Sequence, residues 1–155
     1  MKVVMVDIDG IVNSARSAYA YKMLPHNPYD MEFDWVAVRM LKNFCEEFSA
    51  VCVLSSSWRY SFSHEDMSKH LLGVPFIGAT PLSDEPRPRG EEIKEWFDAN
   101  EHLGIDNYII LDDNGGMLDE QLEHFVQTDA NEGLSYKDLQ KMYKIFGGKA
   151  KPVIF

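Results

Sequence analysis

The stretch KVVMVDIDG, residues 2–10, decides the fold of this chain. Apolar residues fill positions 3–6 and position 8, before and between two aspartates, and the run ends on a glycine. A short, nearly continuous apolar run of this kind is typical of a strand buried on both faces in the middle of a parallel sheet. Because ligands bind beyond the carboxyl ends of strands in open α/β sheets, we expect the chemistry at Asp7 and Asp9.

Asp7 and Asp9 place two negative charges at one strand end. Like charges this close repel each other unless a cation lies between them, so we predict a bound cation. The alternative is a solvent-exposed turn after an edge strand, because Asp-Gly is an ordinary turn dipeptide.

The composition is that of one globular domain spanning residues 1–155, with 45% hydrophobic and 26% charged residues. The net charge of −10 argues against extended, non-specific binding of nucleic acid. No apolar run approaches a membrane span of about 20 residues, and the amino terminus does not resemble a signal peptide. Cys45 and Cys52 lack metal-ligand spacing and are interpreted as buried thiols of a reducing compartment. We therefore expect a cytoplasmic protein.

Further strands of the same type follow. Residues 51–54 form a short apolar run that ends at Ser55, and residues 107–111 form another that ends at Asp112 and Asp113. Weaker strands are predicted near residues 75–78 and 124–128. Apolar residues at three- and four-residue steps predict helices at residues 34–48, 64–72, 91–104 and 135–146. This alternation predicts a doubly wound, three-layer α/β sandwich around a mainly parallel sheet.

Residues 13–30 show no sustained period and are predicted to form a long irregular loop. A long loop in a compact domain is usually functional, and this one begins at the end of the first strand. We interpret it as a candidate lid over that strand end. Arg16, Lys22 and His26 give it a local positive charge, although each of them is equally well explained as a solvated loop residue.

Asp7, Asp9, Asp112 and Asp113 are all expected at one edge of the sheet, because the carboxyl ends of parallel strands meet there. Four carboxylates at one edge require a hard divalent cation. Mg²⁺ is the natural candidate, since it takes oxygen ligands and keeps positions open for water and phosphate.

Ser55 and a basic residue, either Arg89 or Lys94, complete a set of donors suited to a phosphoryl group. The run of serines at 55–57 is alternatively a turn that caps the next element. A basic residue at the start of a helix opposes the helix dipole, so Arg89 is expected to have an anionic partner. Glu91, Glu92 or Asp84 could be that partner without any function.

DIDG, the serine after the second strand, the basic residue at a helix start and LDD at residues 111–113 together resemble the four motifs of haloacid dehalogenase (HAD) superfamily phosphatases. More narrowly, VDIDGIVN, LSSSWR, RGEEIKEWF, YIILDDN and VQTDANEGLS are similar to the phosphatase-like domains of Swiss Army Knife RNA-repair proteins and of related stand-alone phage and bacterial proteins. The resemblance spans nearly the entire chain.

The resemblance implies a role for each matching residue. Asp7 would be the nucleophile that becomes an aspartyl phosphate, and Asp9 the general acid and then the base. Ser55 would hold a phosphoryl oxygen. Asp112 and Asp113 would bind Mg²⁺, with Asp7 and Asp9 completing the acidic set.

The third motif of the superfamily is most often a lysine, and here Arg89 is best placed, with Lys94 as the alternative. Ser55, Ser56 and Arg89 form the expected phosphate-binding set. The chain has no room for a large cap domain, so the resemblance implies a relatively open site, screened chiefly by residues 13–30. An open site favours large or polymeric phosphate esters.

Other classes of protein also use clustered aspartates. A phospho-accepting receiver carries its adjacent acid pair at the first strand, the reverse of the order here, and a Mg²⁺-dependent nuclease would need a basic track. A non-catalytic phosphate-binding module is the remaining alternative. The substrate stays open among nucleotide phosphates, nucleic-acid ends, phosphoproteins and sugar phosphates. Trp58, Arg59, Tyr19 and Tyr21 could contact a nucleotide, although Trp and Tyr near a strand end are more often packing residues of the core or a lid.

Overall fold

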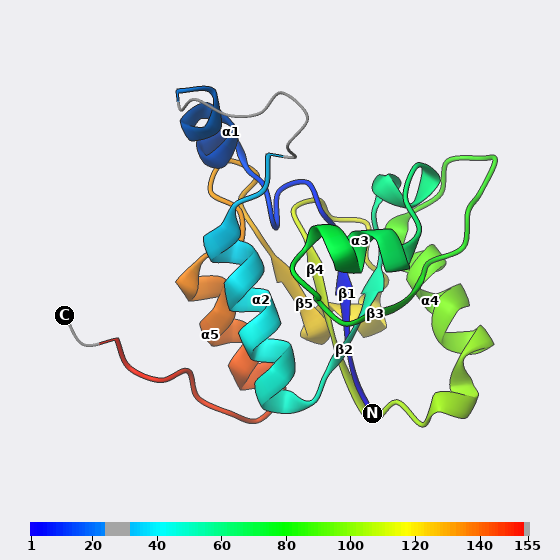
Figure 1. Ribbon diagram of the computed structural model, residues 1–155. Helices are drawn as coiled ribbons and strands as arrows, with labels where there is room; N and C mark the ends of the chain where they lie inside the picture. The colour runs from blue at the N-terminus through cyan, green and yellow to red at the C-terminus, as the bar shows by residue number, and fades with distance from the viewer. Residues whose placement is uncertain (24–31, 154–155) are drawn as a thin grey trace.

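The computed structural model describes residues 1–23 and 32–153 and contains a five-stranded, all-parallel sheet in the order β3-β2-β1-β4-β5 (Figure 1). The strands are β1 (Lys2–Val6), β2 (Val51–Leu54), β3 (Phe76–Ala79), β4 (Asn107–Asp112) and β5 (Phe125–Gln127). Val6 is in register with Leu54 on one side and with Leu111 on the other. The predicted parallel sheet is thereby confirmed, and the stretch that opens the chain is its central strand.

Two apolar cores make the fold three-layered. Side chains alternate along β1, so Val4 and Val6 face one core while Val3 and Met5 face the other. The helices are α1 (Ala15–Lys22), α2 (Trp35–Phe48), α3 (His64–His70), α4 (Arg89–Ala99) and α5 (Tyr136–Ile145). Residues of α2, α3 and α5 pack in the first core, whereas α4 packs in the second. The central strand is therefore buried on both faces, as its sequence predicts.

The described residues also contain three short 3₁₀ helices: η1 (Ser57–Tyr60), η2 (Glu101–Leu103) and η3 (Asp119–His124). Asp34 caps α2 by accepting hydrogen bonds from the backbone of Val36 and Ala37. Ser135 and Asp138 form a capping box at the start of α5. In the part of the chain that the structure describes, no helix is both long and apolar enough to cross a membrane.

The prediction of an irregular loop from residue 13 is wrong for Ala15–Lys22, which form α1. The Oγ atom of Ser14 accepts a hydrogen bond from the backbone of Ser17 and so caps the helix. None of the residues of α1 is buried, so the segment has no apolar stripe and no helical period to detect. Residues 24–30 of the candidate lid, with His26, lie outside the described residues.

Cys45 on α2 and Cys52 on β2 are both free and buried, with 3.4 Å between their sulfur atoms. Burial raises the pKa of the Cys52 thiol. This confirms that the two cysteines are buried thiols.

Candidate active site

Three carboxylates meet at the carboxyl edge of the sheet. Asp7 follows β1, Asp112 ends β4, and Asp113 is the next residue. The parallel pairing of Val6 with Leu111 places these strand ends side by side, and one carboxylate oxygen from each aspartate lies within 4.8 Å of the other two. Asp7 and Asp112 are buried, and Asp113 is half-buried.

Burial makes the charged form of these acids unfavourable. It raises the pKa of Asp7 to about 6, although a hydrogen bond from Ser56 and the charge of Arg89 act in the opposite direction. Burial, together with the charge of Asp7, raises the pKa of Asp112 to about 7. Near neutral pH, the three aspartates are therefore stabilised by bound protons or by a cation. Three oxygen donors at this spacing suit Mg²⁺.

Gly10 makes room for Asp113. Its φ is +80°, in the left-handed region, and a Cβ atom at this position would lie 2.6 Å from the Cβ atom of Asp113. The carbonyl of Gly10 accepts a 2.7 Å hydrogen bond from the Oγ1 atom of Thr128, which follows β5. Asp113 can therefore take its place in the acidic group only because residue 10 has no side chain.

Replacement of Gly10 by alanine is expected to destabilise the protein and to weaken Mg²⁺ binding. The left-handed backbone alone costs an alanine roughly 1–2 kcal/mol, and the overlap with Asp113 adds roughly 1–3 kcal/mol more. Gly104→Ala is the matched control, because Gly104 has a φ of +61° but no described atom within 4 Å of the place that a Cβ atom would take. Urea unfolding and calorimetric Mg²⁺ titration of both variants would measure the difference. Equal losses of stability and of Mg²⁺ affinity would show that Asp113 does not depend on Gly10.

Ser55 lies at the end of β2, and its backbone N–H donates to the carbonyl of Val6 at 2.8 Å. Its side chain is 1% exposed, and among the described residues its Oγ atom has no hydrogen-bond partner. Leaving a buried hydroxyl unpaired costs about 1–3 kcal/mol, so this atom is suited to receive a ligand oxygen. The neighbouring Ser56 caps η1 by accepting from the backbone of Trp58. The serine run thus supplies the predicted cap through Ser56, and it leaves the hydroxyl of Ser55 available for the predicted phosphate contact.

Arg89, rather than Lys94, reaches the acidic group. The Nε atom of Arg89 lies 3.5 Å from a carboxylate oxygen of Asp112. Lys94 lies five residues further along α4, about 140° around the helix axis, and its ammonium group donates to exposed Asp98 at 2.6 Å. The basic residue at this site is therefore Arg89.

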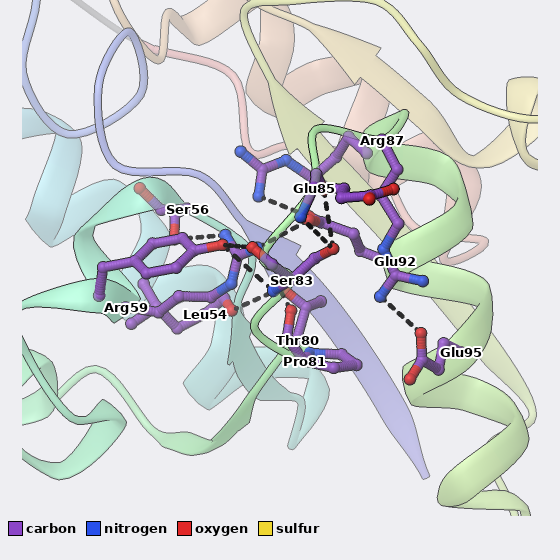
Figure 2. A network of polar contacts seen from close by, with 12 residues as sticks. Leu54, Ser56, Arg59, Thr80, Pro81, Ser83, Glu85, Arg87, Glu92 and Glu95 are labelled. Carbon is purple, nitrogen blue, oxygen red and sulfur yellow. Dashed lines mark hydrogen bonds and ion pairs between the residues drawn. The ribbon is translucent and has the colours of Figure 1, made fainter.

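Glu92 is the second anionic partner of Arg89. It also binds Arg59, a contact that the sequence does not indicate. Its Oε2 atom accepts from the Nη1 atom of Arg89 at 3.1 Å, and its Oε1 atom accepts from the Nη2 atom of Arg59 at 2.8 Å. Arg59 also donates to the carbonyl of Ser56 at 2.7 Å, within the network shown in Figure 2. Its side chain is 3% exposed, so Arg59 mainly joins these segments inside the protein, and it also lines a cleft beside Arg89.

Replacement of Glu92 by glutamine is expected to lower the free energy of unfolding by about 3 kcal/mol, because it leaves the buried guanidinium of Arg59 without its counter-charge. Glu91→Gln, on the exposed side of the same helix turn, is the matched control and should change stability little. Chemical denaturation of the two variants at neutral pH checks this. Equal unfolding free energies would mean that the bridge between the two arginines is not stabilising.

Asp9 lies apart from the other three acids and is exposed. Its Oδ1 atom accepts from the Nδ2 atom of Asn13 at 2.8 Å, and its Oδ2 atom accepts from the indole Nε1 of Trp58 at 3.0 Å. Since β1 ends at Val6, the two-residue spacing of Asp7 and Asp9 does not keep them on one face. The structure thus separates Asp9 from the group that could hold a metal and places it at the rim of the site.

A cleft of about 360 Å³ opens beside Arg89 and Asp112. Residues of η1, including Tyr60, line one side, and the segment from Ser83 to Arg87 lines another. The hydroxyl of Tyr60 donates to the carbonyl of Ser83 at 2.9 Å and ties these two sides together. The cleft therefore has room for a ligand larger than a phosphate ion beside Arg89 and Asp112.

The chain has a parallel sheet, an acidic group beyond the first and fourth strands, a serine beyond the second strand and an arginine at the start of a helix. These features define a domain of the haloacid dehalogenase type. The family model described as the HAD domain in Swiss Army Knife RNA repair proteins matches residues 3–139, and the chain belongs to this family. No curated protein and no solved structure matches the chain.

Proposed function

We propose that the protein is a Mg²⁺-dependent phosphatase that hydrolyses a phosphate monoester through an aspartyl phosphate on Asp7. The observation that carries this proposal is that Asp7 lies with Asp112 and Asp113, while the neighbouring strand end carries Ser55, whose buried hydroxyl has no partner among the described residues. A phosphoryl group bound there would receive a hydrogen bond from Ser55 and the positive charge of Arg89.

The carboxylates fit a divalent cation. Asp7, Asp112 and Asp113 would hold Mg²⁺, which supplies positive charge to the phosphoryl oxygens when bound. Support comes from the raised pKa of two of these acids and from the space that Gly10 leaves for Asp113.

The reaction divides into two steps. A carboxylate oxygen of Asp7 forms a bond to phosphorus while the bond from phosphorus to the leaving oxygen breaks, and Asp9, as the general acid, gives a proton to that oxygen. A water molecule then attacks the phosphorus of the aspartyl phosphate and gives a proton to Asp9. The second step releases inorganic phosphate and restores both side chains.

The substrate that fits best is a phosphate at a nucleic-acid end or on a nucleotide. The family is named for RNA repair proteins, and the cleft beside Arg89 leaves room for more than a phosphate. The net charge of −10 disfavours extended contact with a polyanion, so the protein would bind only the end of the nucleic acid.

A phosphatase screen tests this proposal. Release of inorganic phosphate from 3′- and 5′-phosphorylated oligonucleotides, free nucleotides and aryl phosphates would be measured with Mg²⁺ and with EDTA. We expect Mg²⁺-dependent release, fastest from a nucleotide or an oligonucleotide end. Turnover in EDTA would contradict the metal assignment, and phosphate binding without turnover would indicate a binding module instead.

A further inference from the structure

Asp9 is held by two side chains, and one of them belongs to a cluster of aromatic rings. The indole Nε1 of Trp58 donates to the Oδ2 atom of Asp9 at 3.0 Å. The ring centroid of Trp58 lies 5.6 Å from that of Phe33 and 5.6 Å from that of Phe62, with interplanar angles of 41° and 29°. Aromatic pairs at such distances stabilise one another. The direction of the indole N–H is therefore fixed by packing on two partners, rather than by Asp9 alone.

The second side chain is Asn13, whose amide can adopt only one orientation here. Its Oδ1 atom accepts a 3.0 Å hydrogen bond from the backbone N–H of Gly10, so the Nδ2 group must face the other way. There it donates to the Oδ1 atom of Asp9 at 2.8 Å. Gly10 thus sets the direction of the donor that holds Asp9.

These two bonds restrict a side chain that is otherwise exposed. Asp9 belongs to the turn after β1, where burial does not fix its rotamer. A proton donor must keep a defined position relative to the oxygen it protonates, and a displacement of about 1 Å can cost about 10²-fold in rate. Neither donor belongs to the group formed by Asp7, Asp112 and Asp113.

We propose that Trp58 and Asn13 are positioning residues that hold Asp9 for protonation of the leaving group. The inference rests on the proposed function, because it needs Asp9 as the proton donor of the first step. It extends that function by making the enzyme suited to leaving groups of high pKa, such as the hydroxyl of a sugar or an alkyl chain. Such an alkoxide cannot depart without a proton, whereas a nitrophenolate can.

The test compares two substrates. The quantity is kcat/KM, which reports the steps up to the first irreversible one and so excludes hydrolysis of the aspartyl phosphate. Trp58→Phe keeps an aromatic ring between its partners but removes the N–H donor. We expect kcat/KM for glycerol 2-phosphate to fall about 10²-fold while that for 4-nitrophenyl phosphate changes by less than about threefold. Asn13→Ala should show the same split.

Trp35→Phe is the matched control, because Trp35 contacts Phe33 in the same cluster and is 49% exposed. It should leave both substrates unaffected. In an Asp9→Asn background, Trp58→Phe should cause no further loss, since both changes act on one proton transfer.

Equal losses of kcat/KM for the two substrates would overturn the inference, because a general disturbance of the site does not distinguish leaving groups. If Trp58→Phe does not fold, which thermal unfolding would show, Asn13→Ala provides the same test. Failure of the wild-type protein to hydrolyse either substrate would instead overturn the proposed function, and this inference with it.

Discussion

Replacement of Asp7 by asparagine is expected to abolish phosphatase turnover, with a loss of at least about 10⁴-fold in kcat. An amide oxygen is a poor nucleophile and carries no charge, so the bond from Asp7 to phosphorus would not form. The fold should survive, since asparagine has almost the same shape. Single-turnover assays would check the result, and the aspartyl phosphate should be absent from acid-quenched samples of the variant.

The stability of the Asp7→Asn variant supplies the control. Because burial raises the pKa of Asp7 to about 6, ionisation of this side chain destabilises the metal-free protein at neutral pH. The variant should therefore unfold in EDTA at the same temperature as the wild type or a higher one. Mg²⁺-dependent turnover by a pure sample of the variant would show that Asp7 is not the nucleophile.

Mg²⁺ is expected to stabilise the protein strongly near pH 8 and only weakly near pH 5. A carboxyl group whose pKa is raised by folding contributes stability that is fully present below its unfolded value and is lost as the pH rises through its folded value. For Asp7 and Asp112 this loss runs from about pH 4 to about pH 7. Without metal, the protein should accordingly become less stable across this window, and bound Mg²⁺ should reverse the loss.

The size of the effect follows from the raised values. A rise in the pKa of Asp7 from 3.8 to about 6 corresponds to roughly 3 kcal/mol, and the rise for Asp112 to about 7 to roughly 4 kcal/mol, at about 1.4 kcal/mol for each pH unit. The two do not add, because the charge of Asp7 is itself part of the cause for Asp112. Thermal unfolding with EDTA and with millimolar Mg²⁺ would measure the change.

Asp112→Asn is the matched variant for this experiment. It removes one ionisable group from the site, so in EDTA its stability should depend less on pH than that of the wild type. Mg²⁺ should no longer raise its unfolding temperature. A Mg²⁺ effect of the same size at both pH values in the wild-type protein would contradict a metal site built on these carboxylates.

The sequence predicts most of the sheet, because the fold depends on local signals. Apolar runs at residues 2–6, 51–54 and 107–111 correspond to β1, β2 and β4, and each ends where a polar residue begins. Parallel strands bring their carboxyl ends to one edge, so the meeting of Asp7 with Asp112 follows from the order of elements. Helix α1 was missed because its eight residues are all at least partly exposed and leave no apolar period.

Contacts between side chains far apart in the sequence could not be predicted in this way. Arg59 and Glu92 are 33 residues apart, and nothing local in either segment indicates the other. The bond between Trp58 and Asp9 spans 49 residues, so the separation of Asp9 from the other acids was equally hidden. The position of Lys94 did carry a signal, since Asp98 lies one helical turn further on and offers an ordinary i,i+4 pair.

The central place of β1 has a consequence for synthesis of the protein. Its partner β4 and the Thr128 hydroxyl that binds Gly10, 118 residues away, leave the ribosome late. Until then Asp7 has only β2 beside it and lacks Asp112 and Asp113. Contacts this distant in the sequence form slowly. A nascent or truncated chain that stops before β4 would therefore carry Asp7 without the other two acids, and the proposed metal site would form only after β4 has been made.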